Sequence, residues 1–443
     1  LKVIPCFFQD GIELLYYYMN HCANNNNILG GEYMKDYKFS STALRMKSSI
    51  IRELLKEAMN PGMISFGGGV PDPETFPREE LAKVADKVIR EEYSHSLQYC
   101  PTEGDSVLRE AYLKYLERAE GITGLNLDNI IVTVGSQSAL HLISEILLDE
   151  DSIYFVSKPI YLGAASAFAL RSLNHEDLEL QDDGIDLDRL EKRLAEIEKA
   201  GEMDKVKFIY VIPNFHNPAG VSLSLEKRKR LIEIAEKYDL LIIEDDPYGE
   251  LRYEGEHIPS LFKLAGKERV LMFRTFSKVL SPGMRIGLVV GHENLVRKVT
   301  QAKQAADLCS PSLTQRIAGR YLEQYDLRES LKPTIALYKK KMKLMLDELE
   351  KDFSDIPGVK WTKPSGGLFI WLCLPEGFNT LEMMEYGKKN GVLFIPGVAF
   401  TIDNSCENCM RLSFCLPPEK EIIEGVARLK KTVLEYGKMK GLL

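Results

Sequence analysis

The chain has 443 residues, which allows a large buried core and indicates either two domains or one large domain with a smaller one beside it. We expect no nucleic-acid partner, because the net charge is −8, and no membrane partner, because no apolar run approaches the roughly 20 residues that span a bilayer. Apolar and charged residues occur in the proportions typical of globular proteins.

Residues 1–33 show no regular spacing of apolar residues. They combine tyrosines at 16–18 with asparagines at 24–27, and they lack the cationic segment and the small-residue cleavage site of a signal peptide. We therefore expect residues 1–33 to be a non-native or disordered N-terminal extension, with Met34 as the natural start of the chain.

Short apolar runs alternate with longer amphipathic segments from about residue 129 onward. They predict strands at residues 129–134, 152–156, 207–212, 240–245, 269–273 and 287–291, with helices at 138–148 and 227–238. Because runs without polar alternation suit strands that are covered on both faces, the pattern predicts a mostly parallel sheet between helices. Polar segments follow several of these strands, at the edge where open α/β sheets bind their ligands.

The C-terminal part of the chain follows a different pattern. A long charged helix at residues 338–353 precedes a strand pair with a glycine turn at 360–374, and short strands and a final helix complete the chain. We expect residues 92–330 to form a large domain and residues 331–443 a smaller α+β domain, to which residues 34–91 also contribute.

Eight cysteines are scattered over the chain, which indicates a reducing cytoplasm rather than a disulfide framework, so we expect a cytoplasmic protein. Cys406 and Cys409 form a CxxC pair, but no second pair or nearby histidine completes a zinc site, and no thioredoxin-like setting surrounds it. We interpret the pair as a coincidence within a loop, with local redox sensitivity as the alternative, and we predict no metal site.

Two segments combine features that bind anions. One opens a helix directly after a strand, where free backbone N–H groups and the positive end of the helix dipole suit a phosphate, although an ordinary serine N-cap explains the same turn. The other, TFSKVLSPGMRIG, carries two hydroxyls and an arginine that suit the same anion. The candidate phosphate ligands are Ser136, Gln137, Thr275, Ser277 and Arg285.

Lys278 follows the serine of the second segment. Removal from water and neighbouring positive charge both lower the pKa of a lysine amine, which makes the amine a nucleophile toward an aldehyde. Taken alone, the position is more typical of a surface lysine.

Three acidic residues, Glu244, Asp245 and Asp246, end a strongly apolar strand. A carboxylate held there, which we assign to Asp245, would pair with a heterocyclic nitrogen and keep the nitrogen protonated. The alternative is that these acids cap the turn before Pro247, and we expect this of at least one of them. Tyr248 would hydrogen-bond a phenolic oxygen of the same ring, or else be a half-buried tyrosine at a strand end.

Two further residues complete the candidate site. Asn217 is a neutral donor after another strand, although Asn-Pro also marks an ordinary turn. Tyr161 presents a ring that would stack on a ligand or pack in the core. Together, an amine, an anion site, a carboxylate for a ring nitrogen and oxygen donors at one sheet edge predict pyridoxal phosphate as the cofactor.

From about Phe39 to its end, the chain resembles the fold-type I, class I and II, pyridoxal-phosphate aminotransferases, and most of all their kynurenine/2-aminoadipate branch. The resemblance rests on ISFGGGVPDPETFP, LQYCPTEG, VTVGSQSAL, PNFHNPAG, IIEDDPYG, TFSK…GMRIG, KPSGGLFIW and MRLSF, which occur in the family's order. It implies an α/β fold with a large domain, built on a mostly parallel seven-stranded sheet between helices, and a smaller α+β domain.

The resemblance also implies a role for each candidate residue. Lys278 would form the internal aldimine and then move the proton between Cα and the cofactor. Asp245 would pair with the pyridine nitrogen, Asn217 and Tyr248 would hold the phenolic oxygen, and Tyr161 would stack on the ring. The phosphate would be bound by Ser136, Gln137, Thr275, Ser277 and Arg285, with Tyr99 reaching it from the neighbouring subunit of a homodimer.

Substrate binding is implied for Arg411, Asn217, Gly69 and Arg52. Arg411 would bind the α-carboxylate through two parallel hydrogen bonds, which suit arginine better than lysine. Gly69 and Arg52 match positions near the substrate side chain, although Arg52 fits a solvated helix face equally well. His216 occupies a position that varies in the family, so we expect a turn histidine without a catalytic role. Ala219 replaces the usual hydroxyl residue without touching the chemistry.

The implied activity is a ping-pong amino transfer. The amino group of an L-amino acid (2-aminoadipate, kynurenine, an aromatic or a branched one) would pass through the Lys278 aldimine to a 2-oxo acid, with 2-oxoglutarate expected as acceptor. One alternative keeps the cofactor but acts as a β-lyase. Another is a sensor module without catalysis, which the acidic charge and the lack of a helix-turn-helix pattern disfavour.

Overall fold

The computed structural model describes residues 37–46 and 60–443, and the chain divides into two compact units, residues 1–46 and 47–443. The described part of the first unit forms one short helix, α2 (Ser41–Arg45), and the side chain of Ser40 caps its N-terminus by accepting from the backbone N–H of Ala43 at 3.1 Å. All that follows concerns the second unit.

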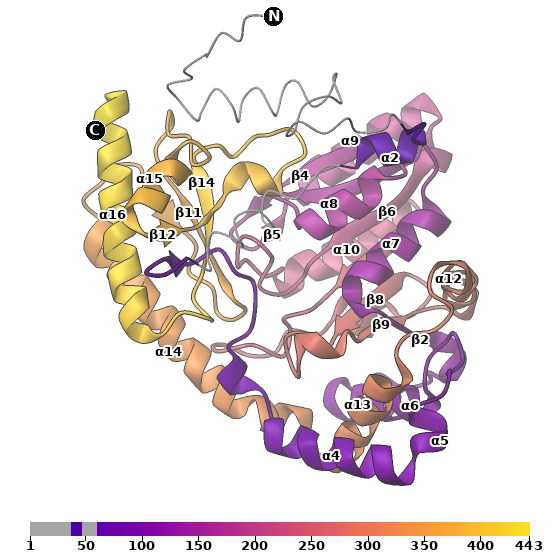
Figure 1. Ribbon diagram of the computed structural model, residues 1–443. Helices are drawn as coiled ribbons and strands as arrows, with labels where there is room; N and C mark the ends of the chain where they lie inside the picture. Colours follow the sequence, from indigo (N-terminus) through magenta and orange to yellow (C-terminus); the bar gives the residue numbers. More distant parts are fainter. Residues whose placement is uncertain (1–36, 47–59) are drawn as a thin grey trace, which may run out of the picture. The chain divides into compact units, whose positions relative to one another are not determined.

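An eight-stranded sheet in the order β2-β9-β8-β7-β6-β3-β4-β5 organises this unit (Figure 1). Strands β8, β7, β6, β3 and β4 are parallel to one another, while β9 is antiparallel to both β2 and β8 and β5 is antiparallel to β4. The strands are β2 (Ile130–Thr133), β3 (Ile153–Lys158), β4 (His175–Gln181), β5 (Gly184–Ile185), β6 (Val206–Val211), β7 (Leu241–Asp245), β8 (Val270–Thr275) and β9 (Gly287–Val290).

This sheet confirms the predicted α/β fold, with the two-residue strand β5 added to the seven expected strands as a hairpin on β4. The apolar runs marked every strand except β4 and β5. Strand β4 lies near the edge of the sheet, and among its seven residues Leu178 alone is buried, so it has no continuous apolar run to reveal it.

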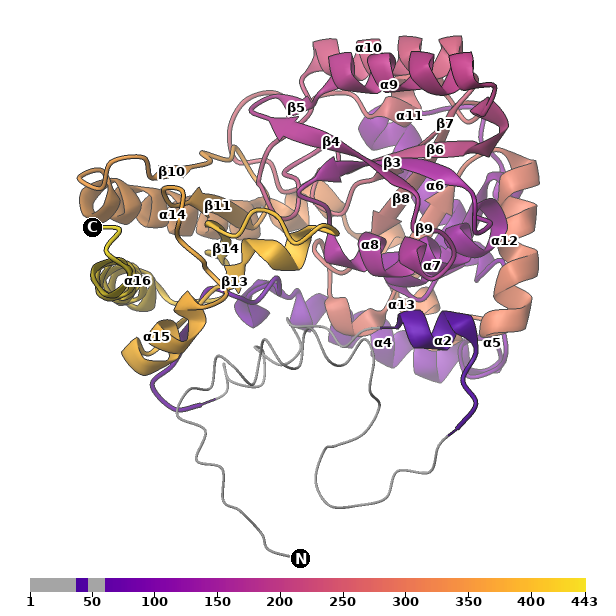
Figure 2. The ribbon, with the colours of Figure 1, turned by 90° about the horizontal axis from the view of Figure 1, so that it is seen from above.

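Helices cover both faces of the sheet (Figure 2), as strands that are buried on both faces require. Helices α7 (Gly135–Leu147) and α8 (Leu162–Ala169) lie on one face, and α9 (Leu187–Ala200) and α10 (Leu225–Lys237) lie on the other. The remaining helices of this part are α4 (Arg78–Glu91), α5 (Tyr93–Ser96), α6 (Ser106–Glu120), α11 (Leu261–Ala265), α12 (Glu293–Ala306) and α13 (Ser312–Gln324).

The C-terminal part contains a four-stranded antiparallel sheet in the order β10-β11-β14-β13. Its strands are β10 (Lys360–Trp361), β11 (Phe369–Cys373), β13 (Ile395–Pro396) and β14 (Cys409–Ser413). Strand β1 (Ile64–Ser65), far away in sequence, pairs in parallel with β12 (Val392–Leu393). The helices here are α14 (Leu327–Phe353), α15 (Met383–Asn390) and α16 (Glu419–Lys440). The domain boundaries given above remain predictions.

Short 3-10 helices occur at η1 (Pro73–Thr75), η2 (Leu127–Asn129), η3 (Met203–Lys205), η4 (Pro282–Met284) and η5 (Gly397–Phe400). Within the described ranges, no helix combines the length and the apolarity needed to cross a membrane. The same residues bring together no group of three or more side chains suited to a metal ion.

One interpretation of the cysteines is wrong. Cys409 is not a loop residue but the first residue of β14, and it forms a disulfide with Cys373, which lies opposite it on β11. The two cysteines are 36 positions apart in sequence, so the spacing of the CxxC motif gave no sign of the pairing. Cys406 is a free thiol in the loop before β14.

Candidate functional site

Several of the predicted site residues lie at the carboxyl edge of the large sheet. Asp245 ends β7, Thr275 ends β8 and Lys278 follows three residues later, while Asn217 lies in the loop after β6. The parallel register of β6, β7 and β8 brings these strand ends side by side, as expected for an open α/β sheet.

The side chain of Lys278 is partly buried. Its Nζ donates a hydrogen bond to the carbonyl oxygen of Gly69 at 2.8 Å. Burial, together with the nearby cations of Arg411 and Arg285, lowers the pKa of Lys278 from its ordinary 10.5 to about 8. A sizeable fraction of the amine is therefore neutral near physiological pH and able to attack a carbonyl.

Asp245 is 2% exposed and carries its two oxygens in different environments. Oδ2 accepts a hydrogen bond from the hydroxyl of Tyr210 at 2.7 Å, whereas Oδ1 is buried and has no hydrogen-bond partner among the described residues. Burial raises the pKa of Asp245 to about 7, against the lowering effect of the Tyr210 hydrogen bond. An N–H donor facing Oδ1 would complete the carboxylate.

The two acids beside Asp245 bond to groups other than the turn before Pro247. Glu244 accepts from the backbone N–H groups of Leu261 and Phe262 at 3.0 and 2.9 Å, at the start of α11. Asp246 pairs with Arg274 at 3.3 Å. Oδ1 of Asp245 and Oδ1 of Asp246 both lack a hydrogen-bond partner among the described residues, but Asp246 already has an arginine as its ion-pair partner. Asp245 is therefore the better candidate of the three acids for pairing with a ligand.

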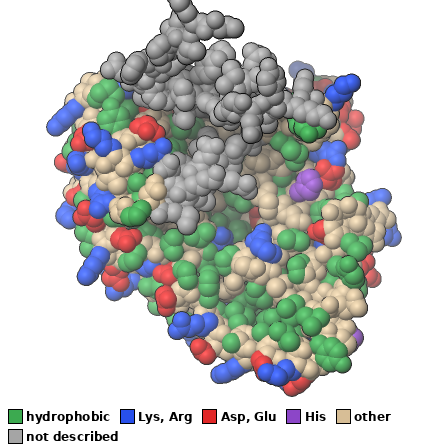
Figure 3. All heavy atoms as spheres, in the orientation of Figure 1, with side chains coloured by type: hydrophobic (Ala, Val, Ile, Leu, Met, Phe, Trp, Pro, Cys, Tyr) green, Lys and Arg blue, Asp and Glu red, His purple; other side chains and the backbone are tan. Residues whose placement is uncertain are grey.

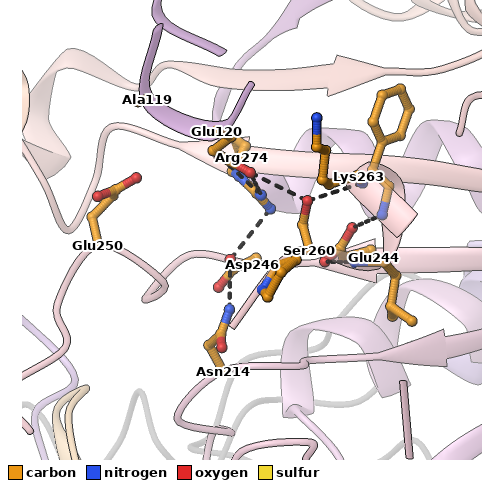
Figure 4. Close-up of polar contacts among 12 residues, drawn as sticks. Ala119, Glu120, Asn214, Glu244, Asp246, Glu250, Ser260, Lys263 and Arg274 are labelled. Atoms are coloured by element: carbon orange, nitrogen blue, oxygen red, sulfur yellow. Dashed lines mark hydrogen bonds and ion pairs between the residues drawn. The ribbon is translucent and has the colours of Figure 1, made fainter. Parts of the chain in front are cut away.

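Figure 4 shows the buried polar network that holds Asp246. The Nδ2 of Asn214 donates to Asp246 Oδ2 at 2.9 Å, and Arg274 lies between Asp246 and Glu120, with its second ion pair at 3.4 Å. Asp246, Arg274 and Thr275 line a cavity of about 30 Å³, which is large enough for a water molecule. The ion pair between Asp246 and Arg274 joins the end of β7 to β8.

Arg411, on β14, is 4% exposed and held on all sides. Its guanidinium donates to Asn217 Oδ1 at 2.9 Å and to the carbonyl oxygen of Gly67 at 2.7 Å. The rings of Phe369 and Phe400 flank it, with their centroids 4.3 and 4.9 Å away. Burial lowers the pKa of Arg411 to about 10, so the group stays charged at neutral pH.

The candidate phosphate ligands lie at and beyond the ends of three paired strands. Thr275 pairs with Gly287, which pairs in turn with Thr133, the end of the strand before Ser136. The hydroxyl of Thr275 donates to Ser277 Oγ at 3.0 Å. A Cβ on Gly287 would lie 2.8 Å from the backbone nitrogen of Ser136, so the close approach of these segments requires glycine there.

Arg285 and the start of α7 also lie against each other. Gly135 has a φ of +73°, and a Cβ on it would lie 2.5 Å from Nη2 of Arg285. Arg285 itself has a φ of +53°, and its Nη2 donates to the carbonyl oxygen of Val134 at 3.4 Å. A guanidinium thus lies at the N-terminus of α7, where the helix dipole already favours an anion.

Tyr161 and Gln137 are neighbours. The hydroxyl of Tyr161 donates to Gln137 Oε1 at 3.5 Å, and Gln137 Nε2 donates to the carbonyl oxygen of Gly163 at 2.8 Å. Burial raises the pKa of Tyr161 to about 12, so its phenol stays protonated. Tyr248 is 4% exposed, meets the ring of Phe369 edge-on at 5.9 Å, and has its pKa raised well above the ordinary value by burial.

The remaining residues named from the sequence are Gly69, Tyr99, Arg52 and His216. Gly69 is at the site, where a Cβ would lie 3.1 Å from the ring of Phe369. Tyr99 is 79% exposed. Arg52 lies outside the described residues. His216 is in a loop as expected, but buried: it hydrogen-bonds Ser157 at 2.8 Å, and burial lowers its pKa to about 3.

Sequence reasoning missed Tyr210, Phe369 and Phe400. Tyr210 carries the one side-chain hydroxyl in the run KFIYVI, and a hydroxyl within an apolar strand was the available sign of a polar contact. The two phenylalanines gave none, because apolar residues next to an arginine in the fold are indistinguishable in sequence from core residues.

The fit of pyridoxal phosphate to this site can be judged from three buried polar atoms. Ser136 Oγ, Asp245 Oδ1 and Arg411 Nε have no hydrogen-bond partner within the described part of the chain. Buried polar groups are nearly always paired, so these three atoms, which belong to candidate site residues, are available to bond a ligand. A phosphate, a ring N–H and a substrate carboxylate match the three in turn.

The comparisons with known proteins agree with this site. The family model "Aminotransferase class I and II" matches residues 61–429. The aromatic-amino-acid aminotransferase 1 of Thermococcus litoralis is 42% identical over 90% of this chain and 95% of its own length, and the 2-aminoadipate transaminase of Thermus thermophilus is 37% identical over 91% and 97%.

A solved structure is similarly close. The kynurenine aminotransferase of Pyrococcus horikoshii, determined with pyridoxamine phosphate, superposes with a TM-score of 0.86 at 40% identity, over 90% of this chain and 97% of that one. The chain belongs to the class I and II aminotransferase family, and its fold is that of the fold-type I enzymes. It is a pyridoxal-phosphate-dependent aminotransferase.

Proposed function

We propose that the protein transfers the amino group of an L-amino acid with an acidic, kynurenine-like, aromatic or branched side chain to 2-oxoglutarate, in a ping-pong sequence that uses Lys278. One observation carries the proposal: the guanidinium of Arg411 and the amine of Lys278 bond to the carbonyl oxygens of Gly67 and Gly69. Both side chains therefore bond to the same three-residue segment, Gly67 to Gly69. A carboxylate-binding group and a reactive amine lie near each other, as binding of an α-amino acid requires.

The relatives support the substrate class. Their names describe action on aromatic amino acids, 2-aminoadipate and kynurenine. These donors share an α-carboxylate and a long side chain. Arg411 would bind the α-carboxylate whatever the side chain is. We propose broad specificity that includes an acidic or aromatic donor.

Pyridoxal phosphate, when bound, supplies an aldehyde that bonds to amines and a ring that accepts electrons. Lys278 would hold the aldehyde at rest and, when a substrate amine replaces it, carry the proton from Cα. Asp245 would accept from the ring nitrogen through Oδ1. The phosphate would be held by Ser136, Gln137, Thr275, Ser277 and Arg285.

Asn217 and Tyr248 would hold the phenolic oxygen, and Tyr161 would stack on the ring. The bond from Arg411 occupies Oδ1 of Asn217, which leaves the Nδ2 donor for that oxygen. The same bond ties Asn217 to the group proposed for the substrate carboxylate. Substrate binding and the electronic state of the ring would therefore be coupled through this amide.

We also propose a homodimer in which Tyr99 reaches the phosphate of the neighbouring subunit. Tyr93, Leu97 and Tyr99 are 63%, 63% and 79% exposed, and Figure 3 shows apolar side chains gathered over the region of α6 and α13. Large exposed apolar patches are typical of protein interfaces. A second copy of the chain would cover this one.

The cytoplasmic location remains a proposal that rests on the spacing of the cysteines, to which the pair Cys373–Cys409 is an exception. The extension over residues 1–33 and the domain boundaries also remain proposals.

A panel of donors assayed with 2-oxoglutarate tests the activity. We expect glutamate to form with 2-aminoadipate and with at least one of kynurenine and an aromatic amino acid, without release of ammonia. Ammonia and pyruvate from cysteine conjugates, with no glutamate formed, would identify a β-lyase instead. Cofactor binding without turnover of any donor would identify a sensor, and activity with alanine alone would contradict the proposed specificity.

A further inference from the structure

Tyr210 lies on β6, beside the strand that carries Asp245, and is 1% exposed. Its hydroxyl lies 2.7 Å from Asp245 Oδ2. A phenol carries one proton, and an ionised carboxylate only accepts, so Tyr210 donates in this bond. Burial and the neighbouring carboxylate raise the pKa of Tyr210 well above its ordinary value, so the donor persists at every pH of interest.

We propose that Tyr210 is a positioning residue for the amino transfer: by holding Oδ2, it turns Oδ1 of Asp245 toward the ring nitrogen and keeps the carboxylate in its charged form. The proposal rests on the pairing of Asp245 with the ring nitrogen under the proposed function. Under this proposal, the neutral hydroxyl of Tyr210 influences how strongly the ring nitrogen keeps its proton.

The geometry explains why a second donor is needed. A carboxylate with both oxygens free in an apolar pocket rotates about its Cβ–Cγ bond and favours its neutral form. The hydrogen bond from Tyr210 holds Oδ2 in place and so prevents this rotation. It leaves the other oxygen without a partner in the described structure, and this is the atom available to the cofactor.

Other charged groups act on Asp245 from a greater distance. Asp246 raises its pKa, and Arg274 on β8 lowers it, while burial is the largest cause of its upward shift. Arg274 is already engaged by Asp246 and Glu120 (Figure 4). The hydrogen bond from Tyr210 is the largest of the effects that lower the pKa of Asp245 against burial, so its loss should raise that pKa.

The variant Tyr210→Phe removes the hydroxyl and keeps the ring, which meets Phe168 edge-on at 5.4 Å. The same cluster offers a matched control, Tyr154→Phe. Tyr154 is also fully buried and also packs on Phe168, but its hydroxyl donates to the backbone oxygen of Ser172 at 3.3 Å, away from Asp245. Thermal melting of both variants would check that each remains folded.

The measurement is the nitrogen-15 NMR signal of ring-labelled pyridoxal phosphate bound to each protein, because the chemical shift reports whether the ring nitrogen carries its proton. We expect the signal of the Tyr210→Phe protein to move toward the unprotonated position at the same pH. We also expect kcat to fall on the order of tenfold or more with little change in KM, since a hydrogen bond to a charged group is lost.

The Tyr154→Phe signal should match that of the unmodified protein. A Tyr210→Phe signal that also stays in place would overturn the inference. Asp245→Asn separates the two levels of the proposal. If Asp245→Asn moves the signal and Tyr210→Phe does not, the role of Tyr210 alone is wrong. If Asp245→Asn leaves it in place, the pairing of Asp245 with the ring, and the inference built on it, both fail.

Discussion

At the scale of single residues, burial determines the chemistry of Lys278. A pKa of about 8 instead of 10.5 leaves roughly 300-fold more neutral amine at pH 7 than an exposed lysine has. The cations of Arg411 and Arg285 add to the effect, because a positive neighbour disfavours a second positive charge. The lysine is therefore prepared for attack before any ligand arrives.

This environment predicts how fast the cofactor-free protein takes up pyridoxal phosphate at different pH values. The rate of bond formation with Lys278 should rise about tenfold per unit below pH 7 and level off above a midpoint near 8. Stopped-flow absorbance would measure it. In Arg411→Met, which removes a neighbouring cation, the midpoint should move upward. A rate that climbs unchanged to pH 10 would show that Lys278 is an ordinary amine.

Several residue roles followed from sequence because their positions are exceptional. Asp245 is the last residue of an apolar strand and Lys278 lies three residues beyond another, at the edge where open sheets bind ligands. The sequence did not separate Asp245 from Glu244 and Asp246, since the difference arises from which side of the strand end each carboxylate faces. Tyr210 was missed because its role depends on pairing with the neighbouring strand.

At the scale of elements, the antiparallel pair β11 and β14 holds Arg411, for which we propose a role in substrate binding. Phe369, on β11, stacks on Arg411, on β14, and the Cys373–Cys409 disulfide joins the two strands at the other end of the same ladder. Cross-strand contacts of this kind fix the register on which the position of Arg411 depends.

The disulfide yields a prediction at this scale. Alkylation of the protein, denatured and purified without reductant, should modify Cys406 and spare Cys373 and Cys409, as peptide mass spectrometry would detect. Cys409→Ser should lower the free energy of unfolding by about 2–4 kcal/mol, because the link over 36 positions no longer restricts the unfolded chain. Labelling of Cys373 before reduction would contradict the pairing.

The elements themselves were predicted where burial is two-sided. The central strands read as continuous apolar runs, and α7 and α10 begin and end within a few residues of the expected helices. Strand β4 and the partner of Cys409 were not predictable in the same way. One lies near a sheet edge and lacks the apolar run, and the other depends on a pairing across distant sequence.

At the scale of the whole molecule, the site is expected to be complete only in a dimer. If Tyr93, Leu97 and Tyr99 form the contact with a second copy, Leu97→Glu should give a monomer that binds pyridoxal phosphate less tightly, because a buried charge opposes association and the partner's phosphate contact is lost. Light scattering and cofactor titration would measure both effects.

Met439→Glu provides the control for this experiment. Met439 is 52% exposed and lies on α16, which contributes no residue to the proposed contact. It should leave both the mass and the cofactor affinity unchanged. A Leu97→Glu protein that remains a dimer with full affinity would show that the interface lies elsewhere.

The most direct test of the central claim is the visible absorption spectrum of the purified protein, recorded before and after adding 2-aminoadipate without an oxo acid. We predict a yellow band from cofactor bonded to Lys278, its shift to the pyridoxamine form on adding the donor, and its return with 2-oxoglutarate. Lys278→Ala should lack the initial band. A protein that stays colourless with added pyridoxal phosphate would contradict the account.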